Sequence, residues 1–148
     1  MSYNVSRSSG INKSVEVEIK YQDISAAATT NTFAAISIPA YGIVKDVTFF
    51  LDTEFDGGAT SELTIEIGDG ADPDGYITAQ SVHADATPVT SALIDGLYLN
   101  DGTTDYVVNG KQYTADDTID VLFTATGGNL DVLTAGAVRI IVNYLDIA

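Results

Sequence analysis

Short runs of alternating apolar and polar residues constrain the fold of this chain more than any other feature. In residues 15–22, V-E-V-E-I-K-Y-Q, the apolar side chains share one face and the polar side chains share the other. This period of two is the pattern of a β-strand with one buried face. The pattern recurs in residues 43–55, 62–68 and 118–126, whereas no segment longer than about ten residues follows the 3.6-residue period of a helix. The sequence therefore predicts an all-β protein.

The spacing of these runs predicts how the strands are arranged. We expect roughly eight or nine short strands with turn residues every ~8–15 positions, a rhythm typical of a β-sandwich or barrel. Residues 137–145, A-V-R-I-I-V-N-Y-L, are apolar on both faces, as expected of a central strand covered on each side. Asn109-Gly110, between β-branched and aromatic residues, favours a hairpin turn. We predict an antiparallel β-sandwich, jelly-roll or Greek-key like, in a single domain over residues 15–148.

Charge is distributed unevenly along the chain. The net charge is −15 and the pI is near 4.1, which disfavours nucleic acid and anionic membranes as partners. Residues 1–45 carry four basic and three acidic side chains, a net +1, and the other residues carry two basic and eighteen acidic ones, a net −16. Residues 1–14 contain Arg7 and Lys13 and no acid, so we predict an extended basic N-terminal arm on an acidic body. The chain has no cysteine, which excludes disulfides and thiolate metal sites.

The predicted arm over residues 1–14 has two interpretations. Terminal segments are often disordered. Alternatively, the arm becomes ordered on an acidic partner surface, with its few apolar and basic side chains as anchors. The residues that this second interpretation assigns to partner binding are Tyr3, Val5, Arg7, Ile11 and Lys13. Because the rest of the chain is acidic, neighbouring copies of the same chain are one such partner.

The stretch Ile65–Ile77, I-E-I-G-D-G-A-D-P-D-G-Y-I, is the strongest candidate for a metal site. Three carboxylates, Asp69, Asp72 and Asp74, stand among glycines, as in calcium-binding loops. An EF-hand alignment that puts Gly75 at position 6 leaves no carboxylate at positions 1 and 12, where ligands are required. Asp-Pro-Asp-Gly is also a turn signal by itself. We therefore predict a turn between two strands and no metal, with a weak calcium site as the alternative.

Catalytic patterns are poorly represented in the sequence. His83 is the only histidine, and neither a G-x-S-x-G elbow nor a glycine-rich phosphate loop is present. Asp-rich segments supply pairs of carboxylates, but a chain with so many aspartates places some of them together by chance. We predict no catalytic residues, no cofactor and no enzymatic activity. The tyrosines that remain candidates for a sugar-binding surface, if they do not pack across strands, are Tyr41, Tyr98, Tyr106 and Tyr113.

Residues 36–77 contain a series of turn and strand motifs. They are an I-P-A-G-like turn at Pro39–Gly42, a V-x-D-V strand at Val44–Val47, an F-D-G-G-like turn at Phe55–Gly58, a further strand and a G-x-x-x-D-x-D loop at Gly68–Asp74. This pattern resembles a segment that recurs in small virion proteins of tailed bacteriophages. The ending Thr134–Tyr144, T-A-G-A-V-R-I-I-V-N-Y, is similar to the closing strand of those proteins. The likeness covers about half of the chain, over residues 33–82 and 118–146.

The resemblance implies a β-sandwich structural component of a phage particle, without catalytic residues. It points to a head decoration (cement) protein that binds the outer surface of the head and stabilises it by bridging neighbouring subunits. The implied partners are the major capsid protein and copies of the same chain, with a homo-oligomer such as a trimer as the expected state. The alternative is a tail or fibre-associated binding module that recognises host surface glycan, with calcium as an optional aid.

Overall fold

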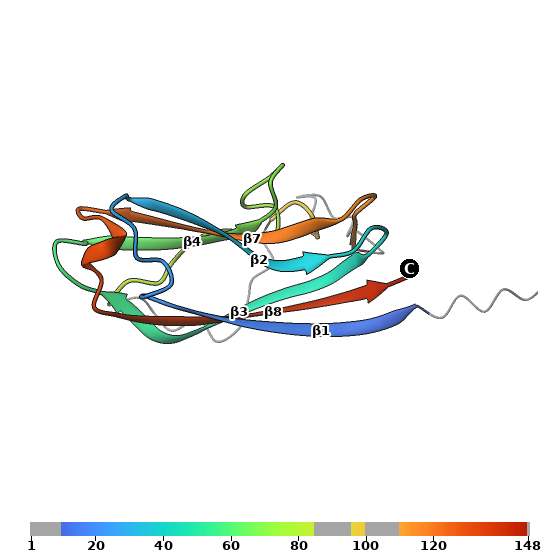
Figure 1. Cartoon of the computed structure of the whole chain (residues 1–148), viewed down its shortest axis with the longest axis horizontal. Helices are drawn as coiled ribbons and strands as arrows, with labels where there is room; N and C mark the ends of the chain where they lie inside the picture. The colour runs from blue at the N-terminus through green and yellow to red at the C-terminus, as the bar shows by residue number, and fades with distance from the viewer. Residues whose placement is uncertain (1–9, 85–95, 100–109, 148) are drawn as a thin grey trace, which may run out of the picture.

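The computed structural model describes residues 10–84, 96–99 and 110–147, and these residues form mainly β-strands (Figure 1). In the described part of the chain, a 3-10 helical turn, η1 (Leu130–Val132), precedes the last strand. The strands are β1 (Ile11–Lys20), β2 (Thr30–Ile38), β3 (Ile43–Asp56), β4 (Glu62–Gly68), β5 (Ile77–Ser81), β6 (Lys111–Gln112), β7 (Asp117–Thr126) and β8 (Ala135–Asp146). Within the same ranges, no helix has the length and apolar character needed to cross a membrane.

These strands form two four-stranded sheets that pack face to face (Figure 1). The strand order is β1-β8-β3-β6 in one sheet and β2-β7-β4-β5 in the other, and every pairing is antiparallel. The chain changes sheet at almost every connection, and only β4 and β5 are both consecutive and paired. This order is that of an eight-stranded jelly roll, which is built from two Greek keys. The prediction of an antiparallel β-sandwich is therefore confirmed, in its jelly-roll form.

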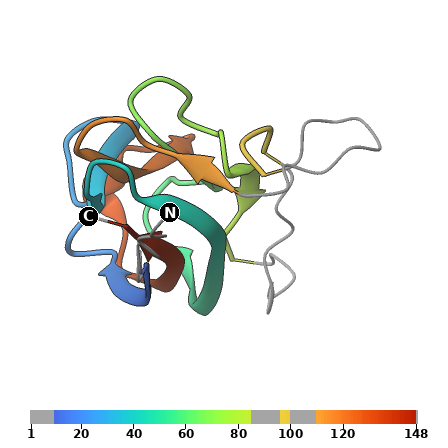
Figure 2. The same cartoon turned by 90° about the vertical axis from the view of Figure 1, so that its right-hand side faces the viewer.

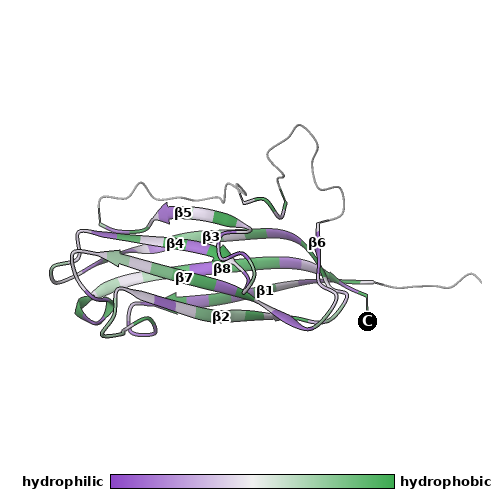
Figure 3. Ribbon diagram, turned by 90° about the horizontal axis from the view of Figure 1, so that it is seen from above, coloured by the Kyte–Doolittle hydropathy of each residue, from purple (hydrophilic) through white to green (hydrophobic). Residues whose placement is uncertain are grey.

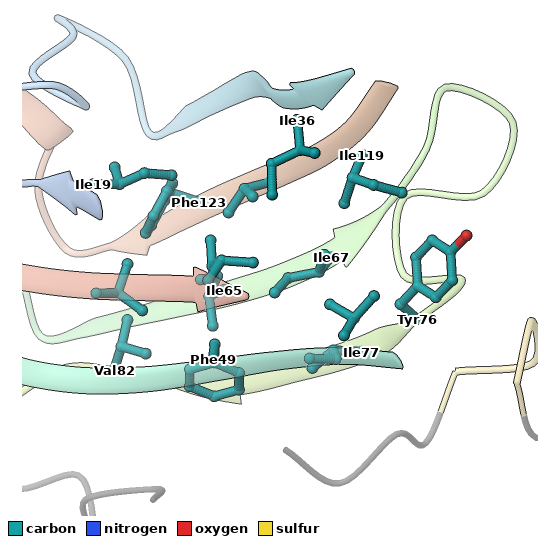
Figure 4. Packing of buried hydrophobic residues seen from close by; sticks show 14 of the residues in the cluster. Ile19, Ile36, Phe49, Ile65, Ile67, Tyr76, Ile77, Val82, Ile119 and Phe123 are labelled. Atoms are coloured by element: carbon teal, nitrogen blue, oxygen red, sulfur yellow. The ribbon is translucent and has the colours of Figure 1, made fainter. Parts of the chain in front are cut away.

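Alternating side chains on each sheet fill the space between the sheets. The alternation is visible along the strands in Figure 3, and Figure 4 shows the packed interior. On β4 and β7 the side chains that are fully buried are Leu63, Ile65, Ile67, Ile119, Val121 and Phe123. The Phe123 ring packs edge-on against Phe33, with centroids 6.3 Å apart, and lies 5.7 Å from the Phe55 ring. Burying one such aromatic side chain stabilises the fold by roughly 1.5–3 kcal/mol.

The last strand, β8, lies in the middle of its sheet. It pairs with β1 over ten positions on one side and with β3 on the other. Its inward side chains are buried, and Ile141 on the outward face is still half-buried. On that face the Arg139 guanidinium donates to Asp52 at 2.6 and 2.9 Å and lies 5.2 Å from the Phe50 ring. The prediction that residues 137–145 form a central strand is confirmed.

The first strand begins earlier than the alternation predicts. β1 starts at Ile11, where it pairs with Asp146 of β8, so residues 11–14 belong to the sheet and not to a separate arm. The alternation misses residues 11–14 because Lys13 stands at an inward position opposite Tyr144, where its ammonium forms an ion pair with the Asp146 carboxylate. A polar side chain at an inward position hides the strand from a pattern based on hydrophobicity.

Two other predictions meet the structure only in part. The alternation in residues 43–55 predicts that Leu51 faces inward with Val47 and Phe49, but Leu51 is only half-buried, because the ladder between β3 and β8 shifts between Leu51 and Thr53. Asn109 of the predicted hairpin lies outside the described residues. Gly110 has the positive φ that the turn requires, at 84°, and the following strand β6 pairs with β3.

Candidate interaction surface

Two of the five residues predicted to bind a partner lie in the part of the chain that the structure describes, at one end of the sandwich. Tyr3, Val5 and Arg7 lie outside the described residues. Ile11 and Lys13 occupy the first positions of β1, and Ile11 is 60% exposed. The structure therefore brings two of the five predicted residues to a single place, the end of the sandwich where β1 begins and β8 finishes.

A groove opens between the two sheets at this end of the sandwich. This end is on the right in Figure 1 and faces the viewer in Figure 2. Its volume is about 540 Å³. β1 and β8 form one wall, and the other wall comes from the end of β2 and the start of β7. We call it the end groove; its charged and large apolar lining residues are Lys13, Ile38, Asp116, Asp117, Tyr144 and Asp146.

The end groove is acidic. Three carboxylates line it and one ammonium group, that of Lys13, lies 2.7 Å from the Asp146 carboxylate. The hydrogen bond to Asp146 and the charge of that carboxylate raise the pKa of Lys13 above its ordinary value. Asp116 accepts a hydrogen bond from the Ala40 N–H at 2.8 Å, which fixes the β2–β3 turn, and Asp117 is exposed. Among the described residues that line the groove, Lys13 is the one cation and pairs with Asp146, so Asp116 and Asp117 have no cation within the groove; Asp117 also lines the adjoining depression that contains Lys111.

Apolar groups lie beside these charges. Ile38 and Tyr144 are buried below the groove, and Ile11 and Ile147 are exposed near its rim. Tyr41, at the tip of the β2–β3 turn, is 56% exposed and has a φ of 66°. A bulky side chain is uncommon in this left-handed region, and such strain is found most often at binding sites. The end of the sandwich thus combines negative charge with exposed apolar side chains, as protein interfaces do.

A second polar cluster lies around Asp69, where the end of β4 approaches β6 and the start of β7, and Asp117 lines both the depression at this cluster and the end groove. Asp69 is only 3% exposed, and its carboxylate accepts hydrogen bonds from the hydroxyls of Tyr98 at 2.7 Å and Tyr113 at 2.9 Å. The Tyr113 hydroxyl also lies 2.8 Å from that of Tyr76. The backbone N–H groups of Ala71 and Asp72 donate to the same carboxylate at 2.9 and 3.0 Å. These contacts attach the β4–β5 loop to the segment 96–99 and to the chain after β6.

These hydrogen-bond donors stabilise the ionised form of Asp69. Burial opposes ionisation, but the hydrogen bonds from Tyr98, Asp72, Tyr113 and Ala71 outweigh it, so the pKa of Asp69 lies below its ordinary value. The Lys111 ammonium lies 4.0 Å from the centroid of the Tyr98 ring, a cation–π contact that covers the cluster. A buried carboxylate satisfied in this way is a structural anchor for the loop.

The three aspartates of the candidate calcium loop do not converge. Asp69 faces the tyrosines, whereas Asp72 and Asp74 line a separate surface depression of about 250 Å³. A side-chain hydrogen bond with Asp74, desolvation and the Asp74 charge raise the pKa of Asp72. Among the described residues, no group of three or more potential ligands is close enough to hold a metal ion. The loop connects β4 to β5, so the prediction of a turn between two strands is confirmed.

The remaining candidates are His83 and the tyrosines considered for sugar binding. Each ring nitrogen of His83 lies 3.1 Å from a backbone carbonyl oxygen, those of Ala84 and Thr60. Of the four tyrosines considered for sugar binding, Tyr113 is buried and Tyr98 packs edge-on against Tyr76 with its hydroxyl on Asp69. Tyr106 lies outside the described residues, and Tyr41 is exposed at the tip of the β2–β3 turn, where its backbone N–H donates to the carbonyl of Tyr113 at 2.6 Å. The three described tyrosines do not form one surface patch.

The strand order of the two sheets defines the chain as an eight-stranded jelly roll. No family model matches the sequence, and no characterised protein matches it by sequence. The fold is similar to that of a chain in the capsid asymmetric unit of cyanophage Pam1, with a TM-score of 0.58 and 18% identity over 99% of this chain and 92% of that one. A chain of the acidic stable capsid structure of Helicobacter pylori bacteriophage KHP30 matches over 93% and 90%, with a TM-score of 0.48 and 10% identity.

Proposed function

We propose that this chain is a structural protein of a bacteriophage particle. The observation that carries the proposal is the match of almost the whole chain to the fold of a chain from a phage capsid. The strand-and-turn motifs shared with small virion proteins of tailed phages support it independently, since they come from the sequence. Jelly rolls also occur in viral capsid domains as a class.

Within the particle, the chain acts as a decoration (cement) protein on the outer surface of the head. It bridges neighbouring capsid subunits, and the major capsid protein is its partner. A protein that binds the assembled shell but not free subunits stabilises the shell by mass action. The end of the sandwich supplies the contact surface, because it carries Ile11, Tyr41 and Ile147, which are large exposed apolar side chains.

The partner-binding residues of this proposal are those of the N-terminal segment together with the start of β1. Tyr3, Val5 and Arg7 precede the sheet, and Ile11 and Lys13 begin it. Because residues 11–14 are paired with β8, a deletion that tests the segment has to stop at residue 9. This deletion leaves every described strand complete.

The test uses phage particles made without this chain. Purified full-length protein should bind such particles and raise the temperature at which they release DNA, and a cryo-electron microscopy map should show it on the head surface. The variant lacking residues 1–9 should keep the melting temperature of the free protein while its occupancy falls. A map that places the chain in the tail would overturn the decoration role and favour the alternative, a tail or fibre-associated module that binds glycan.

A further inference from the structure

We propose that the end groove binds residues 1–9 of a second copy of this chain. The bound segment places the Arg7 guanidinium beside Asp116 and Asp117 and its apolar side chains on the groove floor. Because β1 begins at the same end that carries the groove, two copies that exchange their N-terminal segments face each other through this end. This inference goes beyond the proposed function, because it concerns the free protein and does not require a capsid.

Charge complementarity is the first argument. Residues 1–9 contain one basic side chain, Arg7, and no acid, on a chain with a net charge of −15. The end groove holds three carboxylates against one ammonium, and that ammonium is already paired with Asp146. The groove therefore has room for one further cation, and a guanidinium binds carboxylates with several donors at once.

The apolar lining is the second argument. The groove is bounded by Ile38, Pro39 and Tyr144, so it offers apolar surface below a charged rim. Residues 1–9 carry Tyr3 and Val5 at a spacing of two, which puts both side chains on one face of an extended segment. Arg7 continues the same spacing. A volume of about 540 Å³ accommodates side chains of this size.

The direction of β1 is the third argument, and it favours a second copy over the same chain. β1 runs antiparallel to β8, and its first residue Ile11 lies opposite Asp146 at the end of the sandwich. Gly10 is already beside Leu145 and Ile147 at the outer rim. At Ile11 the axis of β1 points out of the sandwich, and nine extended residues reach about 30 Å. A segment of that length is long enough to enter the end groove of a second copy that faces this end.

The experiment is a charge exchange with the full-length chain. We compare the wild type with Arg7→Glu, with Asp117→Lys and with the double variant, by sedimentation velocity up to about 500 µM in 0.05 M NaCl. The wild type should form oligomers. Each single variant should raise the dissociation constant about tenfold, because it places like charges together, and the double variant should restore association.

Two controls separate the groove contact from a general effect of charge. Asp131→Lys makes the same change in net charge as Asp117→Lys but lies in η1, at the far end of the sandwich (Figure 1), and should leave association unchanged. Thermal melting should show that all variants fold. A wild type that stays monomeric at every concentration, single variants that associate like the wild type, or a double variant that stays dissociated would each overturn the proposal. If the oligomers form with residues 1–9 deleted, the proposal is also overturned.

Discussion

Replacing Asp69 by alanine should destabilise the protein strongly for a change in a loop. The substitution removes a carboxylate that is 3% exposed and that accepts four hydrogen bonds. The donors that lose their acceptor include two backbone N–H groups and the hydroxyl of Tyr98. The Tyr113 hydroxyl keeps Tyr76 as its other partner. The loss therefore comes from partly buried donors left without their acceptor, because the substitution keeps Cβ and removes only the carboxylate.

The magnitude follows from the number of donors. A hydrogen bond to a charged group contributes roughly 1.5–3 kcal/mol, and the donors of one cluster are not additive. Leaving a partly buried donor without its acceptor costs roughly 1–3 kcal/mol, so we expect a total loss of about 3 kcal/mol. For a domain of this size, that loss lowers Tm by roughly 10 °C.

Asp69→Asn is the matched variant, because it keeps the shape and removes the charge. The amide oxygen still accepts from Tyr98, Ala71 and Asp72, and the amide nitrogen can donate to the Tyr113 oxygen once that hydroxyl donates to Tyr76. We expect a loss of about 1–2 kcal/mol at pH 7. The comparison of the two variants separates the contribution of charge from that of hydrogen bonding.

The pH dependence has a definite sign. Because the folded-state pKa of Asp69 is lowered, its stabilising contribution is fully present above the ordinary carboxylate pKa, near 3.9, and is lost as the pH falls through the folded value. The difference in unfolding free energy between wild type and Asp69→Asn should therefore shrink between pH 6 and pH 2. Urea denaturation at several pH values measures it. A difference that grows on acidification, or an alanine variant within 2 °C of the wild-type Tm, would refute the anchor role of Asp69.

Two further predictions concern β8. Gly136 has a φ of 138°, and a Cβ there would meet the buried Phe55 ring, so Gly136→Ala should lose about 2–4 kcal/mol in urea denaturation. Gly70→Ala is its control, because no atom lies within 4 Å of that Cβ and stability should stay within about 0.5 kcal/mol. Arg139→Gln removes the exposed ion pair with Asp52 and should lower Tm slightly, with the difference from wild type vanishing at 1 M NaCl. A loss from Arg139→Gln as large as that from Gly136→Ala would contradict this estimate.

The strands could be predicted from the sequence because their signal is local. Leu63, Ile65 and Ile67 alternate without interruption, and all three are buried as the pattern indicates. The order of the strands has no such signal, since β1 pairs with a strand more than 110 residues further along the chain. The early start of β1 was missed for a related reason, because Lys13 reads as solvent-exposed until its partner Asp146 is known.

The candidate sites also divide into local features, which the sequence predicts, and features that depend on distant residues, which it does not. Asp-Pro-Asp-Gly correctly indicated a turn, since turn chemistry depends on adjacent residues. The anchoring role of Asp69 depends on Tyr98 and Tyr113, which lie 29 and 44 positions away, so no spacing rule reveals it. The end groove was also missed, because Asp117 and Asp146 meet only after two sheets have packed. The distribution of charge along the sequence did indicate that residues 1–14 differ from the acidic body, and the end groove is an acidic surface opposite in charge to that segment.

The central place of β8 has a consequence for how the protein is made. A ribosome releases β1 and β3 long before β8, and neither can pair with the other until β8 lies between them. Folding of that sheet therefore waits for the last strand, and its rate is limited by contacts between distant parts of the chain. During synthesis the apolar faces of β1 and β3 stay uncovered, and exposed apolar surface of this kind makes a folding chain prone to aggregation. A stall near residue 134 would yield a product that cannot close its sandwich.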